Sequence, residues 1–95
     1  MPTNSHDVEM EQAAIEARVI RVIATTQDLP VEVVTPDKSF AELNIDSFAG
    51  INIVFELENE FDISIPDEGA QTMRSVNNAV AGVRQLLKEK GSQSA

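Results

Sequence analysis

Cysteine, tryptophan and tyrosine are all absent from this 95-residue chain, and four phenylalanines are its only aromatic residues. Without cysteine there are no disulfides, no thiolate zinc sites and no thiol nucleophile. The few rings leave little surface on which bases or sugars could stack. No apolar run approaches the roughly 20 residues of a membrane-spanning helix, and the amino-terminal residues lack the basic start and apolar run of a signal peptide. We therefore expect a cytoplasmic protein that does not insert into a membrane.

Positive charge is also scarce, with 7 Lys and Arg against 16 Asp and Glu and a net charge of −9. This balance argues against a nucleic-acid partner, because few side chains could neutralise phosphates, and it favours basic partners. Lys38 and Arg74 are consecutive bases, so residues 39–73 carry no positive charge. The acids of that range could be ordinary solvated helix faces, but their concentration favours a docking surface for basic partners. They are Glu42, Asp46, Glu56, Glu58, Glu60, Asp62, Asp67 and Glu68.

The spacing of apolar residues predicts a first helix over residues 8–26. Its expected inner face consists of Ile15, Val19, Val22, Ile23 and Thr26. Residues 27–46 show no sustained period and contain Pro30 and Pro36, so a long loop follows. Its apolar residues indicate that the loop packs on the core: Val31, Val33, Val34, Phe40, Leu43 and Ile45.

Capping residues predict the remaining helices. Asp46 or Ser47 can cap a second helix that runs to about Glu60, with an expected inner face at Ile53, Leu57 and Phe61. A short third helix starts at residues 67–68. A last helix runs from Ser75 to just before Gly91, and one face of it carries Val76, Ala79, Val80, Val83, Leu86 and Leu87. The expected fold class is all-α, a small four-helix bundle with a long loop between its first two helices and a short third helix. Residues 1–7 are expected to form a flexible leader, 8–90 one domain and 91–95 a flexible tail.

Residues 40–68, FAELNIDSFAGINIVFELENEFDISIPDE, contain two recognisable elements. The first is Asp46-Ser47-Phe48 at the start of the second helix, and the second is Glu60-Phe61-Asp62 followed by Ile65-Pro66-Asp67-Glu68. At this spacing, in an acidic chain of this length, the pair resembles the acyl carrier protein family, which has Asp-Ser-Leu, an acidic helix and then Phe-Asp…Ile-Pro-Asp-Glu. The resemblance covers about residues 8–88.

The resemblance implies that Ser47 carries a 4′-phosphopantetheine arm through a phosphodiester, and that the thiol of the arm holds an acyl group as a thioester. A phosphopantetheinyl transferase would attach the arm with help from Asp46, and free N–H groups at the helix start can receive the phosphate charge. The alternative to an attachment site is that Asp46-Ser47 only caps the helix and has no further function. A catalytic Ser47 is disfavoured, because the only histidine, His6, lies in the polar leader. We therefore expect a carrier protein rather than an enzyme.

Several positions depart from the family pattern. Asn44 stands where the family usually has glycine, although asparagine also tolerates a left-handed backbone. Phe48 replaces leucine, and Ala49 and Asn52 stand where typical fatty-acid carriers have acids. These changes favour a specialised carrier in fatty-acid or related lipid biosynthesis, and we expect the carrier to be a monomer. Its expected partner contacts are Phe48, Ile51, Phe55, Glu56 and Glu60, although Ile51 and Phe55 could instead be core residues.

The cargo stays open at this point. The expected partners are the transferase and acyl-loading and acyl-transfer enzymes with basic docking surfaces, but the loading enzyme chooses the cargo. An amino acid or a polyketide unit is therefore an alternative to a fatty acyl chain. A different class of function is an unmodified acidic adaptor that kept the fold, against which the intact Asp46-Ser47 argues.

Overall fold

Four α-helices and one short 3-10 helix make up the described part of the protein. The computed structural model describes the backbone of residues 4–94 and the side chains of residues 13–90. The elements are α1 (Asn4–Gln27), the 3-10 helix η1 (Val31–Val33), α2 (Ser47–Phe61), α3 (Asp67–Thr72) and α4 (Val76–Ser94). The prediction of an all-α fold with a long loop after the first helix and a short third helix is confirmed. No helix in the described part of the chain is long and apolar enough to cross a membrane.

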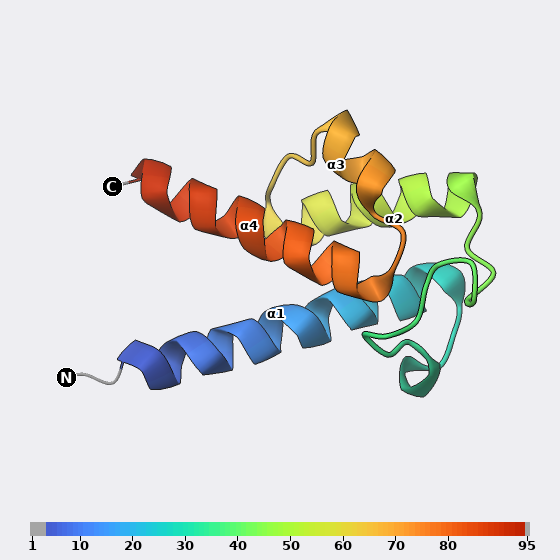
Figure 1. Ribbon diagram of the computed structural model, residues 1–95, viewed down its shortest axis with the longest axis horizontal. Coiled ribbons are helices and arrows are strands. Elements are labelled where there is room, and N and C mark those ends of the chain that lie inside the picture. Colours follow the sequence, from blue (N-terminus) through green and yellow to red (C-terminus); the bar gives the residue numbers. More distant parts are fainter. Residues whose placement is uncertain (1–3, 95) are drawn as a thin grey trace.

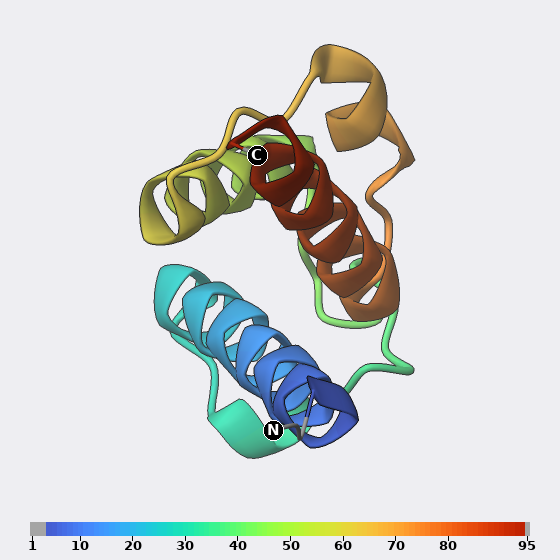
Figure 2. The same cartoon turned by 90° about the vertical axis from the view of Figure 1, so that its left-hand side faces the viewer.

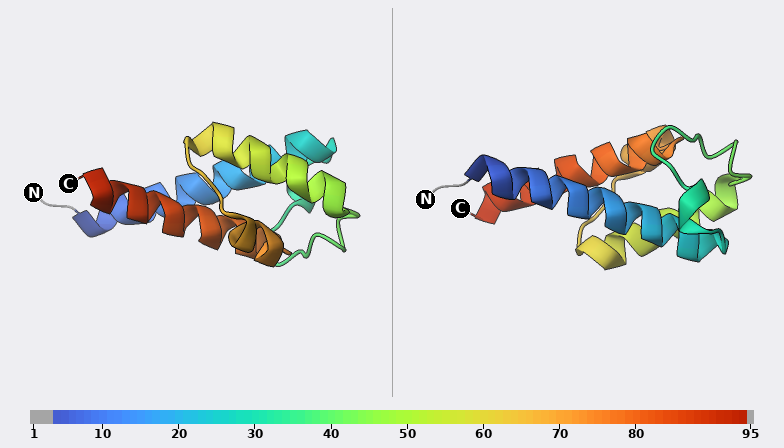
Figure 3. Two further views of the ribbon diagram at one scale, coloured as in Figure 1. Left: turned by 90° about the horizontal axis from the view of Figure 1, so that it is seen from above. Right: turned by 90° about the horizontal axis from the view of Figure 1, so that it is seen from below.

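The helices α2 and α4 both run antiparallel to α1, which contacts each of them (Figure 1). The short helix α3 lies on the far side of α2 and α4 from α1, as the end view in Figure 2 shows. The amino end of α1 and the carboxyl end of α4 lie at one end of the molecule, and α2 begins at the opposite end (Figure 3). The start of α2 is therefore far from the amino end of α1 and from the carboxyl end of α4.

The core is built from the predicted faces of the three long helices. Val19 and Ile23 of α1 are fully buried, and so are Ile53 and Leu57 of α2. The α4 face contributes Val76, Ala79, Val80 and Val83. The stripe at Ile53, Leu57 and Phe61 is confirmed as the inner face of α2. The helical spacing of apolar residues was sufficient to find this core.

The long loop packs on the core only in part. Val34, Phe40 and Ile45 are buried as predicted, but Val31 and Val33 are 53% and 41% exposed, so the prediction is wrong for these two valines. They belong to η1, a tight turn of three residues whose geometry carries them to the outside and delivers Val34 to the core. The exposure of Val31 and Val33 therefore follows from the turn by which the loop changes direction.

Both outer helices extend beyond their predicted bounds. The helix α1 begins at Asn4 and not at Val8, and α4 continues through Gly91 to Ser94. Polar residues are well tolerated in a first helical turn, and glycine inside a helix costs only about 1 kcal/mol relative to alanine. Residues 4–7 and 91–94 are thus helical, residues 1–3 and 95 lie outside the described residues, and the division of the chain at 8 and 90 remains a prediction.

A short antiparallel bridge ties the loop before α2 to the start of α4. Ser39 pairs with Ser75, the Phe40 N–H donates to the Arg74 carbonyl oxygen at 2.8 Å, and the Val76 N–H donates to the Lys38 carbonyl oxygen at 3.0 Å. These two bonds join segments 36 residues apart in the sequence, by the difference between 75 and 39. The bridge fixes the position from which the chain approaches α2.

Candidate modification site

Ser47 is the first residue of α2, and its side chain is exposed. Asp46 is the N-cap, with φ −87° and ψ −174°, and its Oδ1 accepts a hydrogen bond from the Ala49 N–H at 2.9 Å. Of the two predicted caps, the structure therefore selects Asp46. Within the described part of the chain, no group binds the Ser47 hydroxyl, which leaves its oxygen accessible to another protein.

A tight turn delivers the chain to this helix start. Asn44 adopts φ 60°, so asparagine does support the left-handed backbone predicted at this position. The Asn44 N–H donates to the Ala41 carbonyl oxygen at 3.0 Å, and the Ile45 N–H donates to the Phe40 carbonyl oxygen at 2.8 Å. Because Ile45 is buried immediately before Asp46, the cap is anchored to the core.

The start of α2 also presents backbone donors. The first helical hydrogen bond runs from the Gly50 N–H to the Asp46 carbonyl oxygen at 2.8 Å. The N–H groups of Ser47 and Phe48 lie ahead of that bond, where helical N–H groups have no partner within the helix. Together with the positive end of the helix dipole, they favour an anion such as a phosphate on the Ser47 oxygen.

A pocket of about 680 Å³ opens beside Ser47, between α2, α3 and the loop that precedes α2. Its volume falls within the range usual for small-molecule sites. Its lining residues are Phe40, Ile45, Asp46, Ser47, Gly50, Ile51, Val54, Ala70, Gln71, Met73 and Arg74. Sequence reasoning missed this pocket because its walls come from separate segments. Its mainly apolar walls suit an uncharged chain tethered at Ser47.

The outer face of α2 carries an apolar ridge. Phe48 is 82% exposed, Ile51 52% and Phe55 58%. These positions follow each other at i, i+3 and i+7, so their side chains share one side of the helix. The alternative that Ile51 and Phe55 are core residues is excluded by their exposure.

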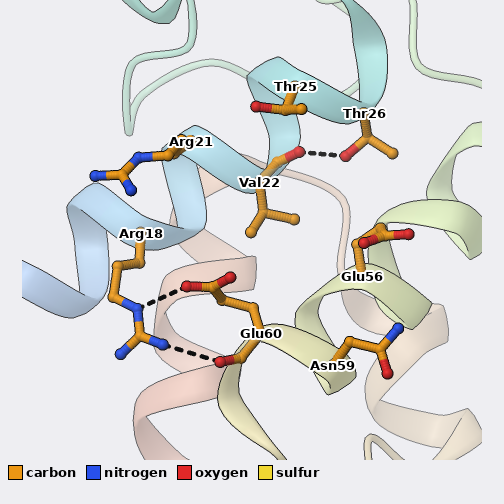
Figure 4. A pocket seen from close by; sticks show the side chains of 8 residues that line it. All are labelled: Arg18, Arg21, Val22, Thr25, Thr26, Glu56, Asn59 and Glu60. Atoms are coloured by element: carbon orange, nitrogen blue, oxygen red, sulfur yellow. Dashed lines mark hydrogen bonds and ion pairs between the residues drawn. The ribbon is translucent and has the colours of Figure 1, made fainter.

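Of the three acids in the second half of α2, two have a partner within the described chain and one does not. The Glu58 carboxylate accepts a hydrogen bond from the Ile65 N–H at 2.7 Å, which holds the loop after α2. The Glu60 carboxylate pairs with Arg18 of α1 at 2.8 Å (Figure 4). Glu56 is exposed and makes no ion pair or hydrogen bond with any described residue. Of these three acids, Glu56 is therefore the one that can pair with an approaching partner without breaking a hydrogen bond or ion pair within the described chain.

Figure 4 shows a second, smaller pocket of about 440 Å³ between α1 and α2. Glu56 and Glu60 line it together with Arg18 and Arg21. Arg21 points away from Glu60 in this view and makes no ion pair within the described chain. This pocket lies on the α1 side of α2, whereas Ser47 lines the pocket on the α3 side.

Ser47 is thus an exposed serine at a capped helix start, with free N–H groups and a neighbouring apolar pocket, and it is accessible to a modifying enzyme. Comparisons with known proteins identify the family. The model of the phosphopantetheine attachment site matches residues 17–83. An acyl carrier protein of Rickettsia bellii (strain RML369-C) is 38% identical over 72 residues, covering 75% of this chain and 84% of that protein. The same-named protein of Rickettsia bellii (strain OSU 85-389) is 36% identical over 72 residues, covering 75% of this chain and 89% of that protein.

The fold is also that of a solved relative. A crystal structure of an acyl carrier protein from Thermotoga maritima has a TM-score of 0.73 and 29% identity, covering 84% of this chain and 94% of that chain. The chain belongs to the acyl carrier protein family. It is a carrier with a covalently attached phosphopantetheine group and not an enzyme, as its sequence predicted.

Proposed function

We propose that Ser47 is the attachment residue and that Asp46 assists the attachment. The observation that carries the proposal is the position of the Ser47 hydroxyl, which is exposed at the first residue of α2 beside a pocket of about 680 Å³. The match to the phosphopantetheine attachment site spans this residue. When bound, the arm supplies a terminal thiol, on which cargo is held as a thioester.

In the attachment step, the Ser47 oxygen forms a bond to the phosphorus nearest the pantetheine of coenzyme A. The pyrophosphate bond breaks, adenosine 3′,5′-bisphosphate leaves, and the hydroxyl proton passes to a base of the transferase. The N–H groups of Ser47 and Phe48 favour the phosphate charge on the product. The Asp46 carboxylate stands next to the reacting hydroxyl, where it can help to hold the magnesium ion that such a transfer requires.

Intact mass spectrometry tests this assignment. Incubation with coenzyme A, magnesium and a phosphopantetheinyl transferase should add one phosphopantetheinyl group to the wild type and none to Ser47→Ala. The matched control is Ser64→Ala, which removes another exposed serine from the loop after α2 and should leave modification unchanged. Modification that persists in Ser47→Ala would assign the arm to another residue.

We propose further that the cargo is an acyl chain of fatty-acid or related lipid biosynthesis. Support comes from the apolar side chains that line the pocket beside Ser47, among them Phe40, Val54 and Met73. An amino acid or a polyketide unit is the alternative cargo within the carrier class. The unmodified adaptor is set aside, because the family model that matches this chain is that of a phosphopantetheine attachment site. Mass spectrometry of the protein from its native cell separates the cargoes, because it reports the group bound to the arm.

Partner docking on α2 is the third part of the proposal. Phe48, Ile51 and Phe55 form the exposed apolar ridge, and Glu56 flanks it on the α1 side. We assign partner contact to these four residues, with Glu60 in a lesser role because its charge is already paired with Arg18. The partners are the transferase and acyl-handling enzymes that present an apolar hollow edged by basic residues. The carrier itself acts as a monomer in the cytoplasm. Analytical ultracentrifugation would test the monomeric state.

A further inference from the structure

The pocket beside Ser47 is lined by one negative and one positive side chain, and the arm would bring a further negative charge to it. Asp46 lines the pocket, and its carboxylate is held at the helix start by the bond from the Ala49 N–H. A phosphodiester on Ser47 would add a second negative charge next to it. Among the described residues that line this pocket, Arg74 is the one with a positive charge.

Arg74 directly follows residues 39–73, which carry no positive charge, and the fold places it in the wall of this pocket. Its carbonyl oxygen accepts the hydrogen bond from the Phe40 N–H at 2.8 Å, and its own N–H donates to the Asn78 Oδ1 at 3.2 Å. Phe40 and Arg74 are the neighbours of the bridged residues Ser39 and Ser75, and both line the pocket.

The side chain of Arg74 is not used elsewhere. It is exposed, and its guanidinium makes no ion pair or hydrogen bond within the described part of the chain, including none to Asp46. Its backbone, in contrast, is fixed on both sides. A guanidinium presents parallel N–H donors that match two oxygens of a phosphate, so Arg74 is an anchored base with an unused, phosphate-binding head.

We propose that Arg74 is a positioning residue that binds the phosphodiester of the arm on Ser47. The inference rests on the proposed attachment at Ser47. It explains how a phosphate is accommodated beside Asp46 in a range of the chain without any other base. By holding the phosphate, Arg74 sets the direction in which the arm leaves Ser47, toward the pocket that Arg74 itself lines.

Nuclear magnetic resonance of the protein with and without the arm tests the proposal. In isotope-labelled wild type, attachment of the arm should shift the Arg74 Nε–H signal downfield and leave the Arg21 signal in place. In Arg74→Gln, the phosphorus resonance should move from its wild-type position toward that of the armed protein unfolded in urea. Arg21→Gln is the matched control, because it removes an exposed arginine that lines the other pocket, and its phosphorus resonance should remain at the wild-type position.

The two proposals fail in different ways. No mass increase in any variant, the wild type included, overturns the attachment proposal. A normal mass increase with an unmoved Arg74 Nε–H signal overturns the role of Arg74 alone. The same holds if the phosphorus resonances of Arg74→Gln and wild type coincide. The Nε–H measurement needs no variant, so it decides the question even if Arg74→Gln folds poorly.

Discussion

Arg18 reaches from α1 to Glu60 near the end of α2, with its Nε 2.8 Å from the Glu60 Oε2 and its second guanidinium nitrogen 2.9 Å from the Glu60 carbonyl oxygen. The same guanidinium stands over the Phe61 ring, 4.4 Å from its centre. One arginine therefore binds a side chain, a carbonyl oxygen at the carboxyl end of a helix and an aromatic face. The pair stabilises the junction of α1 and α2 and removes Glu60 from the charges open to a partner.

Replacing Arg18 by alanine should lower the free energy of unfolding by about 1–2 kcal/mol. An exposed ion pair contributes up to about 1 kcal/mol, and an exposed cation–π contact about 0.5–1 kcal/mol. Urea denaturation measures the difference. Arg21→Ala, one turn further along α1 and without such contacts, should be neutral. If both variants lose the same stability, the contacts of Arg18 contribute nothing particular.

Leu57→Ala should lower the free energy of unfolding by roughly 2–5 kcal/mol, because Leu57 is fully buried and truncation leaves a cavity. In a domain whose whole stability is about 5 kcal/mol, this loss approaches complete unfolding. Ile51→Ala is the control on the same helix, since Ile51 is 52% exposed and its truncation should change stability by about 0.5 kcal/mol at most. Equal denaturation midpoints for Leu57→Ala and wild type would contradict the assigned inner face of α2.

Glu56→Lys should slow association with the modifying transferase, and the difference from wild type should shrink as salt is added. Glu56 has no internal partner, so the change alters the surface field without breaking a contact within the described chain. Stopped-flow association across a salt series measures it, against a Debye length of about 10 Å at 0.1 M. Glu32→Lys makes the same charge change on η1, away from α2, and should have a smaller effect. Equal salt slopes for the two variants would show that only the net charge matters.

Phe48→Ala should weaken the same complex at every salt concentration, because the contact of this ring is apolar. Phe48 is 82% exposed, so its removal should leave the free energy of unfolding almost unchanged. Titration calorimetry at low and high salt gives the affinity, and urea denaturation gives the stability. A loss of affinity that disappears in high salt would assign the effect to charge and not to the ring.

Gly50→Ala should raise the free energy of unfolding by roughly 0.5–1 kcal/mol, since glycine is costly inside a helix and an added methyl group meets nothing within 4 Å. Gly82→Ala on α4 is the control, because its methyl group makes only an ordinary contact of 3.6 Å with Met73 and Gly82 does not line the pocket beside Ser47. Both should raise the melting temperature, by about 4–8 °C for each kcal/mol. Of these two glycines, only Gly50 lines the pocket beside Ser47. Its added methyl group would take up space in which a bound acyl chain is sheltered from water, so only Gly50→Ala should also hasten hydrolysis of a short acyl thioester on the arm. Equal hydrolysis rates would show that the pocket does not shelter cargo.

Local patterns were enough to predict much of this protein. The helical faces at Val19, Ile53 and Val80 follow from apolar spacing, and Asp46 was one of two caps that side-chain chemistry allowed. The left-handed backbone of Asn44 was expected from the family resemblance, since the family usually has glycine there and asparagine tolerates this conformation. These features depend on neighbours within a turn or two of the chain.

Features that depend on distant pairs could not be predicted. Nothing near Glu60 in the sequence indicates that Arg18, 42 positions away, neutralises it. Nothing near Arg74 indicates that the bridge between Ser39 and Ser75 brings it to the pocket beside Ser47. Val31 and Val33 were misassigned to the core for the same reason, since their exposure depends on where η1 lies against α1.

The start of α2 lies at the end of the molecule opposite the amino end of α1 and the carboxyl end of α4 (Figure 1). An affinity tag, a fluorophore or a solid support placed beyond either of these two helix ends is therefore separated from Ser47 by the length of the bundle. Immobilised protein would present the start of α2 to solution in one orientation, with the apolar ridge unobstructed. A biosensor that carries this protein should therefore capture partners equally well whether the protein is immobilised through its amino or its carboxyl terminus.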